Sequence, residues 1–214
     1  MEPDITNLRK EYSLQILLEK DLAPNPISQF TKWWGEVLKT EIVEPNAMTL
    51  ATASSDGMPS ARIVLLKGFD ENGFVFYSNY KSYKALQIEE NPKACLVFFW
   101  KEIERQVRVV GLVSKVTLEK SDEYFASRPE GSRIGAWTSP QSQVIKSRDW
   151  LDNQNTILTK QMQNTKIDRP PYWGGYIVKP VIVEFWQGRS SRLHDRIQYS
   201  LNENGDWIIE RLAP

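Results

Sequence analysis

The chain has 214 residues, which suits a single domain, and its 41% hydrophobic and 25% charged residues are typical of a folded globular protein. Its 27 basic and 27 acidic residues cancel, so the chain lacks the positive field of a general nucleic-acid binder, and any anion site must be local. A single histidine and a single cysteine exclude an internal disulfide and the His/Cys clusters of zinc sites, so we expect no metal.

The N-terminal sequence MEPDITNLRKEYS has neither the basic start nor the apolar stretch of a signal peptide. No apolar run reaches the roughly 18 residues that a membrane helix needs. We therefore expect a cytoplasmic protein that makes no membrane contact. The lone cysteine, Cys95, fits such a reducing compartment.

Residues 1–47 resemble a polar lead-in followed by a helix. Pro26 lies near the start of this helix, and apolar residues recur after it at helical spacing, namely Phe30, Trp33, Trp34, Val37 and Leu38. From residue 48 onward the pattern changes to short β-rich runs, which are MTLATAS, SARIVLLKGF, FVFYSN, ACLVFFW and RQVRVVGLVSKVTL. Turn signals such as Asp56-Gly57 and Asn91-Pro92 separate these runs, and this regular spacing favours an antiparallel barrel or sandwich.

Two helical segments follow, EKSDEYFASR before Pro129 and the amphipathic SRDWLDNQNTILTKQMQ. The chain then returns to strands with YIVKPVIVEFWQG and DWIIERLAP. Strands from both ends of the chain must share one sheet, which favours a Greek-key arrangement over separable domains. The sequence thus predicts one mainly β domain over residues 1–214 with peripheral helices, and with the lead-in and helix at about 1–47.

The sequence lacks the glycine loops that hold phosphate in nucleotide-binding proteins. Residues 68–73 have the glycine spacing of a P-loop, but Phe74 stands where lysine is required, so this stretch is a hairpin turn. No G-x-G-x-x-G motif occurs, which makes a dinucleotide-binding Rossmann site improbable. A phosphate would therefore have to be held by basic and hydroxyl side chains.

Several segments offer such side chains, and each also has a purely structural interpretation. Arg62 and Lys67 bracket an apolar strand, but residues five apart point to opposite faces unless the strand is interrupted. The stretch from Tyr77 to Lys84 is dense in hydroxyls and amines, and an ordinary polar loop explains it equally well. Gln106 suits the imide edge of a heterocycle, although most strand glutamines simply face solvent.

Tyr124 and Arg128 are four residues apart in a predicted helix, so their side chains share a face. Ser132 follows Pro129, where it could cap the next helix. Together the three residues could form an anion pocket. A surface helix end with a routine cap is the commoner explanation.

The only histidine lies in the segment RSSRLHDR, residues 189–196. If this segment is extended, Arg192, His194 and Arg196 occupy alternate positions and point from one face. Nearby positive charges favour neutral imidazole, whereas a bound anion would favour its charged form. A histidine between arginines on one face therefore points to an anionic ligand.

Six segments together resemble the pyridoxamine 5'-phosphate oxidase family, and the similarity runs in order from about Arg9 to the C-terminus. These segments are RIVLLKGFDENGFVFYSNYKSYK, ERQVRVVG, YFASRPEGSRIGAWTSPQS, WGGYIVKP, EFWQGRSSRLHDR and ERLAP. The resemblance implies an FMN-binding split β-barrel and a homodimer with its flavin sites at the subunit interface. It also implies that no classical nucleophile is required.

By position in these motifs, the resemblance implies FMN contacts from Arg62, Ile63, Val64, Leu65, Leu66, Lys67, Tyr77, Ser78, Tyr83, Lys84, Gln106, Gln141, Ser142, Trp186 and Arg196. It implies substrate contacts from Arg9, Lys10, Glu11, Tyr12, Lys67, Tyr124, Arg128, Ser132, Arg192, Leu193 and His194, with the first four in a mobile cover. Of these, Arg192 and His194 would hold the pyridine ring and its reacting C4' substituent, and they are the expected catalytic pair.

The activity implied is oxidation of pyridoxine or pyridoxamine 5'-phosphate to pyridoxal 5'-phosphate, with FMN as first acceptor and O2 converted to hydrogen peroxide. One position departs from the family pattern, because arginine is common where this chain has Tyr83. Tyrosine cannot make a charge-assisted pair with phosphate, so we expect weaker FMN retention.

Two other functions fit part of this pattern. A flavin-binding relative with a different redox substrate would keep the FMN residues and lose the substrate residues, yet Tyr124, Arg128, Ser132, Arg192 and His194 are all present. A carrier of FMN or pyridoxal phosphate is the non-enzymatic alternative. Release of peroxide on addition of pyridoxine phosphate would distinguish the enzyme from such a carrier.

Overall fold

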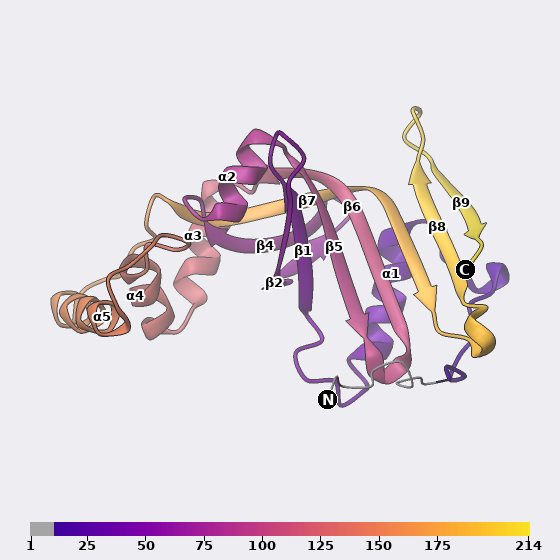
Figure 1. Cartoon of the computed structure of the whole chain (residues 1–214), viewed down its shortest axis with the longest axis horizontal. Coiled ribbons are helices and arrows are strands. Elements are labelled where there is room, and N and C mark those ends of the chain that lie inside the picture. Colours follow the sequence, from indigo (N-terminus) through magenta and orange to yellow (C-terminus); the bar gives the residue numbers. More distant parts are fainter. Residues whose placement is uncertain (1–10) are drawn as a thin grey trace, which may run out of the picture. The chain divides into compact units, whose positions relative to one another are not determined.

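The computed structural model describes residues 11–214 (Figure 1). The strands in this range are β1 (Ala47–Ala53), β2 (Pro59–Leu65), β3 (Gly68–Asp70), β4 (Gly73–Asn79), β5 (Lys93–Trp100), β6 (Arg105–Lys115), β7 (Trp173–Gln187), β8 (Asp195–Leu201) and β9 (Trp207–Leu212). The α-helices are α1 (Pro26–Val37), α2 (Tyr83–Glu90), α3 (Leu118–Ser127), α4 (Glu130–Thr138) and α5 (Arg148–Met162). Short 3-10 turns are η1 (Glu19–Asp21), η2 (Lys101–Ile103) and η3 (Ser190–Arg192).

In the described part of the chain the nine strands form one sheet. Its main order is β2-β1-β5-β6-β7-β4-β3, and β8 pairs with both β7 and β9. The pairs β3/β4, β4/β7, β7/β8 and β8/β9 are all antiparallel. The long strand β7 therefore pairs with β4 on one side and with β8 on the other. This confirms the prediction that strands from both ends of the chain share one sheet.

The chain divides into two compact units. The first contains the described residues up to Thr49 together with 96–110 and 180–214. Its core forms where α1 packs: the Phe30 ring lies 5.1 Å from that of Phe98, and the Trp33 ring 5.1 Å from that of Phe185. The helix starts as expected, with Pro26 at its first position and the Asn25 side chain accepting the Ser28 N–H at 2.8 Å.

The second unit contains residues 50–95 and 111–179. Phe125, Ile134, Ile167 and Trp173 form a hydrophobic cluster in it, between α3, α4 and the start of β7. Gly73 opens β4 with φ of +135°, and a side chain there would collide with the carbonyl of Val178. This close approach explains why the hairpin needs glycine at that position.

Four features differ from the sequence predictions. The run SARIVLLKGF is not one strand, since β2 ends at Leu65 and β3 begins at Gly68. The polar stretch after Asn79 leads into helix α2, and a separate helix, α4, follows Pro129. Strand β8 was also not anticipated. Among residues 11–214, no helix is long and apolar enough to cross a membrane.

Candidate functional site

The second unit contains a cavity of about 770 Å³. Strand β2, the end of β4, the start of α2, and helices α3 and α4 with the loop after them all contribute to its wall. The lining residues are Arg62, Ile63, Val64, Leu65, Lys67, Tyr77, Ser78, Asn79, Tyr83, Lys84, Tyr124, Arg128, Pro129, Ser132, Gln141, Ser142 and Trp173. Fourteen of these seventeen positions are predicted FMN or substrate residues, drawn from segments up to 80 positions apart in the sequence (from Arg62 to Ser142).

Four cationic side chains line this cavity: Arg62, Lys67, Lys84 and Arg128. None of them forms a salt bridge with a carboxylate within residues 11–214. Lys84 is 9% exposed, and its burial, followed by the charge of Arg62, lowers the pKa of its ammonium group. Positive charges gathered without acidic partners make the cavity a site for an anion.

Neutral oxygens hold Arg62 in place. Its Nη1 donates to Thr52 Oγ1 at 2.6 Å and to the Leu50 carbonyl at 3.2 Å, while Nη2 donates to Ser60 Oγ. Both hydroxyls in turn donate to Oε1 of Gln87, a buried residue of α2. Burial lowers the pKa of Arg62, and no carboxylate offsets that cost in the described chain.

A second polar group surrounds the ammonium of Lys84. Its Nζ lies 3.2 Å from Ser78 Oγ and 3.4 Å from Ser82 Oγ. The side-chain oxygen of Gln141 accepts from Ser78 Oγ and from the Asn79 N–H, both at 3.4 Å. These hydrogen bonds attach the loop that carries Gln141 to the end of β4. In the sequence, only the family resemblance had indicated a role for Gln141.

Stacked aromatic rings form one wall of the cavity. The rings of Tyr77 and Tyr124 stack with centroids 3.9 Å apart, and Trp173 continues the stack at 5.5 Å from Tyr77. The guanidinium of Arg128 lies 4.6 Å from the centroid of Trp173, a cation–π distance. Its Nη1 is buried and has no hydrogen-bond partner in the described chain.

The strand break explains how Arg62 and Lys67 come to line the same cavity. Because β2 ends at Leu65, the alternation that would separate them does not extend to Lys67, and both side chains line one cavity. The prediction that Ser132 caps a helix was wrong. It lies inside α4, whose N-cap is Pro129, but it still lines the cavity with Tyr124 and Arg128. Leu66, by contrast, is buried in the core and outside the lining.

The remaining predicted residues that the structure describes lie in the first unit. Arg9 and Lys10 fall outside the described residues, and Glu11 is exposed. Gln106 is half-buried in β6, and Trp186 lies in β7. Leu193 is 69% exposed.

Arg196 in β8 donates to buried Glu184, with Nε to Oε1 at 2.8 Å, and Arg108 donates to the other carboxylate oxygen. These two arginines overcome the effect of burial and lower the pKa of Glu184.

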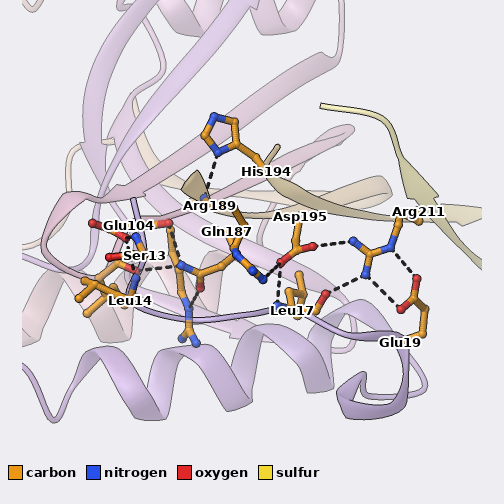
Figure 2. A network of polar contacts seen from close by, with 12 residues as sticks. Ser13, Leu14, Leu17, Glu19, Glu104, Gln187, Arg189, His194, Asp195 and Arg211 are labelled. Atoms are coloured by element: carbon orange, nitrogen blue, oxygen red, sulfur yellow. Dashed lines mark hydrogen bonds and ion pairs between the residues drawn. The ribbon is translucent and has the colours of Figure 1, made fainter. Parts of the chain in front are cut away.

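His194 has a fixed orientation within this unit (Figure 2). Its Nδ1 accepts the backbone N–H of Arg189 at 3.1 Å. Its ring centroid lies 4.7 Å from that of Trp186 and 5.9 Å from that of Tyr12. Burial, and after it the positive charge of Arg192, lower the pKa of the imidazole, while Asp195 acts in the opposite direction. The neutral ring therefore carries its proton on Nε2.

The extended arrangement predicted for RSSRLHDR was wrong. Residues Ser190–Arg192 form the turn η3, in which Ser191 has φ of 53° and Arg192 has φ of 61°. Strand β8 begins only at Asp195. Left-handed conformations at two successive residues reset the direction of the chain, so alternation along a strand does not relate Arg192 to Arg196.

A network of buried and half-buried carboxylates attaches the N-terminal segment to this part of the unit (Figure 2). Glu104 Oε2 accepts the N–H groups of Ser13 and Leu14 at 2.9 and 3.1 Å. Asp195 Oδ2 accepts the N–H of Leu17 at 3.1 Å, and its Oδ1 accepts from Arg211 at 2.8 Å. Arg211 also donates to the carbonyl of Leu17. We call these contacts the N-terminal clasp.

Sequence reasoning missed some residues that now stand out. Asn79, Pro129 and Trp173 line the cavity, and Trp173 had appeared only as part of the segment WGGYIVKP. Gln87, Thr52 and Ser60 carried no motif at all, because their role depends on a helix and two strands meeting in space.

Residues 35–154 match the family model described as pyridoxamine 5'-phosphate oxidase, and residues 173–214 match one described as the pyridoxine 5'-phosphate oxidase C-terminal dimerisation region. A relative from Nostoc punctiforme named pyridoxine/pyridoxamine 5'-phosphate oxidase is 53% identical over 214 residues, covering the whole of both chains. The chain belongs to the pyridoxamine 5'-phosphate oxidase family. Membership in this oxidase family makes it an enzyme and an oxidoreductase, as the resemblance implied.

Two solved structures support the fold of this family member. PhzG from Burkholderia lata, in complex with tetrahydrophenazine-1-carboxylic acid, is 28% identical with a TM-score of 0.88, covering 94% of this chain and 100% of its own. A pyridoxamine 5'-phosphate oxidase-related, FMN binding protein from Nostoc punctiforme is 19% identical with a TM-score of 0.70, covering 90% and 100%. The predicted mainly antiparallel split-barrel fold with peripheral helices is confirmed.

Proposed function

We propose that this enzyme uses FMN to oxidise pyridoxine 5'-phosphate or pyridoxamine 5'-phosphate to pyridoxal 5'-phosphate, in vitamin B6 metabolism and salvage. O2 is the final acceptor and becomes hydrogen peroxide, and the amine substrate also releases ammonia. The observation that carries the proposal is the set of four cations that line one cavity without a carboxylate partner in the described chain. Both FMN and the substrate are phosphate esters, and each needs such partners.

The cavity fits FMN by the chemistry of its donors. Arg62 and Lys84 are two half-buried or buried cations close enough that one lowers the pKa of the other, and a phosphate dianion would relieve that repulsion. Ser78, Tyr83, Gln141 and Ser142 add neutral donors. We assign these residues, with the β2 segment 62–67, to FMN, and we extend the assignment to Gln106, Trp186 and Arg196 on the basis of the family resemblance.

We assign binding of the substrate phosphate to Lys67, Tyr124, Arg128 and Ser132. Arg128 supports this assignment best, because the residue lines the cavity and its buried Nη1 has no partner in residues 11–214. We assign binding of the pyridine ring to Arg192, Leu193 and His194. The N-terminal residues Arg9, Lys10, Glu11 and Tyr12, of which the structure describes the last two, would cover the bound substrate. Tyr12 already contacts the ring of His194 edge-on.

When bound, FMN supplies the acceptor for the hydride that leaves C4' and passes the electrons to O2. The protein's task is to bind and orient the reacting carbon. His194 is suited to donate a hydrogen bond from Nε2 to a polar substituent of the pyridine ring, since its Nδ1 is already engaged by the Arg189 N–H. Arg192 cannot act as a nucleophile, because a guanidinium stays protonated, so it acts by clamping and polarising the substrate.

We further propose that the enzyme is a homodimer. The C-terminal residues 173–214 match a model described as a dimerisation region, which supports this assignment. Sedimentation or light scattering of the purified chain tests it, and a monomer at micromolar concentration would contradict it.

The decisive experiment is to purify the protein, look for a flavin spectrum, and add each phosphate ester without oxygen. Bleaching of the flavin band by either ester supports the proposal, and peroxide release on readmission of air separates the enzyme from a carrier protein. If neither ester bleaches the band, the assignment of substrate is wrong.

Substitution of Arg192 tests its proposed role. Arg192→Gln should lower kcat as well as weaken substrate binding, because polarisation matters most in the transition state. A rise in KM at constant kcat would show that Arg192 contributes to binding alone.

A further inference from the structure

Gln87 is a buried glutamine that none of the assigned roles uses. It lies in α2, three positions after Lys84, and is 2% exposed. Its Oε1 accepts from Thr52 Oγ1 and from Ser60 Oγ, each at 2.6 Å, and its Nε2 donates to the carbonyl of Met58 at 3.4 Å. One amide oxygen therefore engages two hydroxyls from different strands.

These hydrogen bonds determine which way the hydroxyls face. A hydroxyl has one proton and two lone pairs. Because Thr52 and Ser60 both give their proton to Gln87, only lone pairs remain to face Arg62, and both hydroxyl oxygens accept from its guanidinium. A hydroxyl can donate or accept a hydrogen bond, but the amide of Gln87 leaves the hydroxyls of Thr52 and Ser60 able only to accept one from Arg62.

The partners of Arg62 differ from those of two other arginines that are buried or half-buried, Arg105 and Arg196. Arg105 pairs with Glu36, and Arg196 pairs with Glu184. Arg62 has three acceptors, which are the Thr52 and Ser60 hydroxyls and the Leu50 carbonyl, and all are neutral. The guanidinium is therefore oriented without its charge being cancelled, and the charge is left for a ligand.

We propose that Gln87 is a positioning residue that sets the preference of this site for phosphorylated over unphosphorylated flavin. It does so by holding Thr52 and Ser60 as acceptors, so that Arg62 points at the ligand phosphate with its charge intact. The inference rests on the proposed function, since it takes FMN to be the ligand of the cavity.

The test compares FMN with riboflavin, which lacks only the phosphate. The flavin-free full-length chain is titrated against the fluorescence of each flavin, and the ratio of the two dissociation constants is the readout. Gln87→Glu places a carboxylate beside the hydroxyls and Arg62, so the FMN preference should fall roughly tenfold, with riboflavin binding changed less than about twofold. A merely structural role would weaken both flavins alike. Leu86→Glu, an exposed change in the same helix, is the control for added charge.

Thr52 provides a second pair of variants in case Gln87→Glu does not fold. Thr52→Val removes one acceptor with little change of shape and should lower the FMN preference several-fold, whereas Thr52→Ser should restore it. An unchanged ratio in Gln87→Glu, or in Thr52→Val if that variant alone folds, overturns the role of Gln87 while leaving the proposed function standing. A wild-type chain that does not prefer FMN overturns both.

Discussion

The backbone N–H of Arg189 donates to Nδ1 of His194 at 3.1 Å, across the turn that contains Ser191 and Arg192 (Figure 2). This hydrogen bond uses the lone pair that protonation of Nδ1 would require. The burial of the ring and the charge of Arg192 act in the same direction, and together they lower its pKa. The turn η3 therefore holds the imidazole neutral with a donor at Nε2.

The first prediction is that His194 titrates below its ordinary pKa of 6.5. Since it is the only histidine, its ring signals can be followed by NMR without assignment. Arg192→Gln should raise the pKa by removing a nearby positive charge. A wild-type value at or above 6.5, or no rise in the variant, would contradict the proposed environment.

The same shift has a consequence for stability. The folded pKa lies below the unfolded one, so between the two values the unfolded chain binds more protons. The contribution of His194 to the free energy of unfolding is thus complete above about pH 6.5 and falls as the pH drops toward the folded pKa. Urea titrations of the wild type and of His194→Asn at pH 7.5 and 5.5 measure this difference.

Some features of the fold and of the candidate site could be predicted from the sequence, and others could not. Alternating apolar runs predicted the strands, because these depend on local periodicity. The helical spacing assumed for Tyr124 and Arg128 was wrong, since α3 ends at Ser127 and Arg128 is extended, although both residues line the cavity. The turn at Ser191 and Arg192 could not be found in this way, since neither residue is a glycine that would signal a left-handed backbone. Helix α2 was hidden by its polar start, and Gln87 depends on contacts 27 and 35 positions away in the sequence.

A second prediction concerns Tyr83, which is 51% exposed and lines the cavity at the start of α2. Tyr83→Arg should tighten FMN binding about fivefold, which corresponds to roughly 1 kcal/mol, the upper range for a solvent-exposed ion pair. Tyr83→Phe serves as the matched control and should lose at most the single hydrogen bond of the phenol. Equal FMN dissociation constants for Tyr83→Arg and the wild type would refute the idea that this departure from the family weakens retention.

The third prediction concerns the N-terminal clasp. Glu104→Gln removes the charge that accepts the Ser13 and Leu14 N–H groups, and Asp195→Asn weakens the contacts with Leu17 and Arg211. Hydrogen bonds to a charged acceptor contribute about 1.5 to 3 kcal/mol, so each variant should speed hydrogen exchange at these amides by at least about tenfold. Mass spectrometry of exchanged peptides covering residues 13–17 measures the effect.

A control for the clasp is Glu19→Gln. Arg211 donates to Glu19 at 2.6 Å, and this bond lowers the pKa of the Glu19 carboxyl to about 2, but the carboxyl accepts no backbone N–H of residues 13–17. Exchange at Ser13 and Leu14 should therefore stay near the wild-type rate in this variant. If Glu104→Gln and Glu19→Gln change the exchange rates equally, the carboxylates hold the segment only through the general charge of the surface.

The last prediction concerns Arg128, whose guanidinium lies over Trp173 and leaves one buried donor unsatisfied in the described chain. Lysine keeps the charge but loses the planar fork that stacks on indole and bonds phosphate through two donors. Arg128→Lys should therefore raise KM for pyridoxine 5'-phosphate about tenfold with a smaller change in kcat. Arg133→Lys is the matched control, since Arg133 in α4 also has a buried unsatisfied nitrogen but does not line the cavity. Equal effects of the two substitutions on KM would place the substrate phosphate elsewhere.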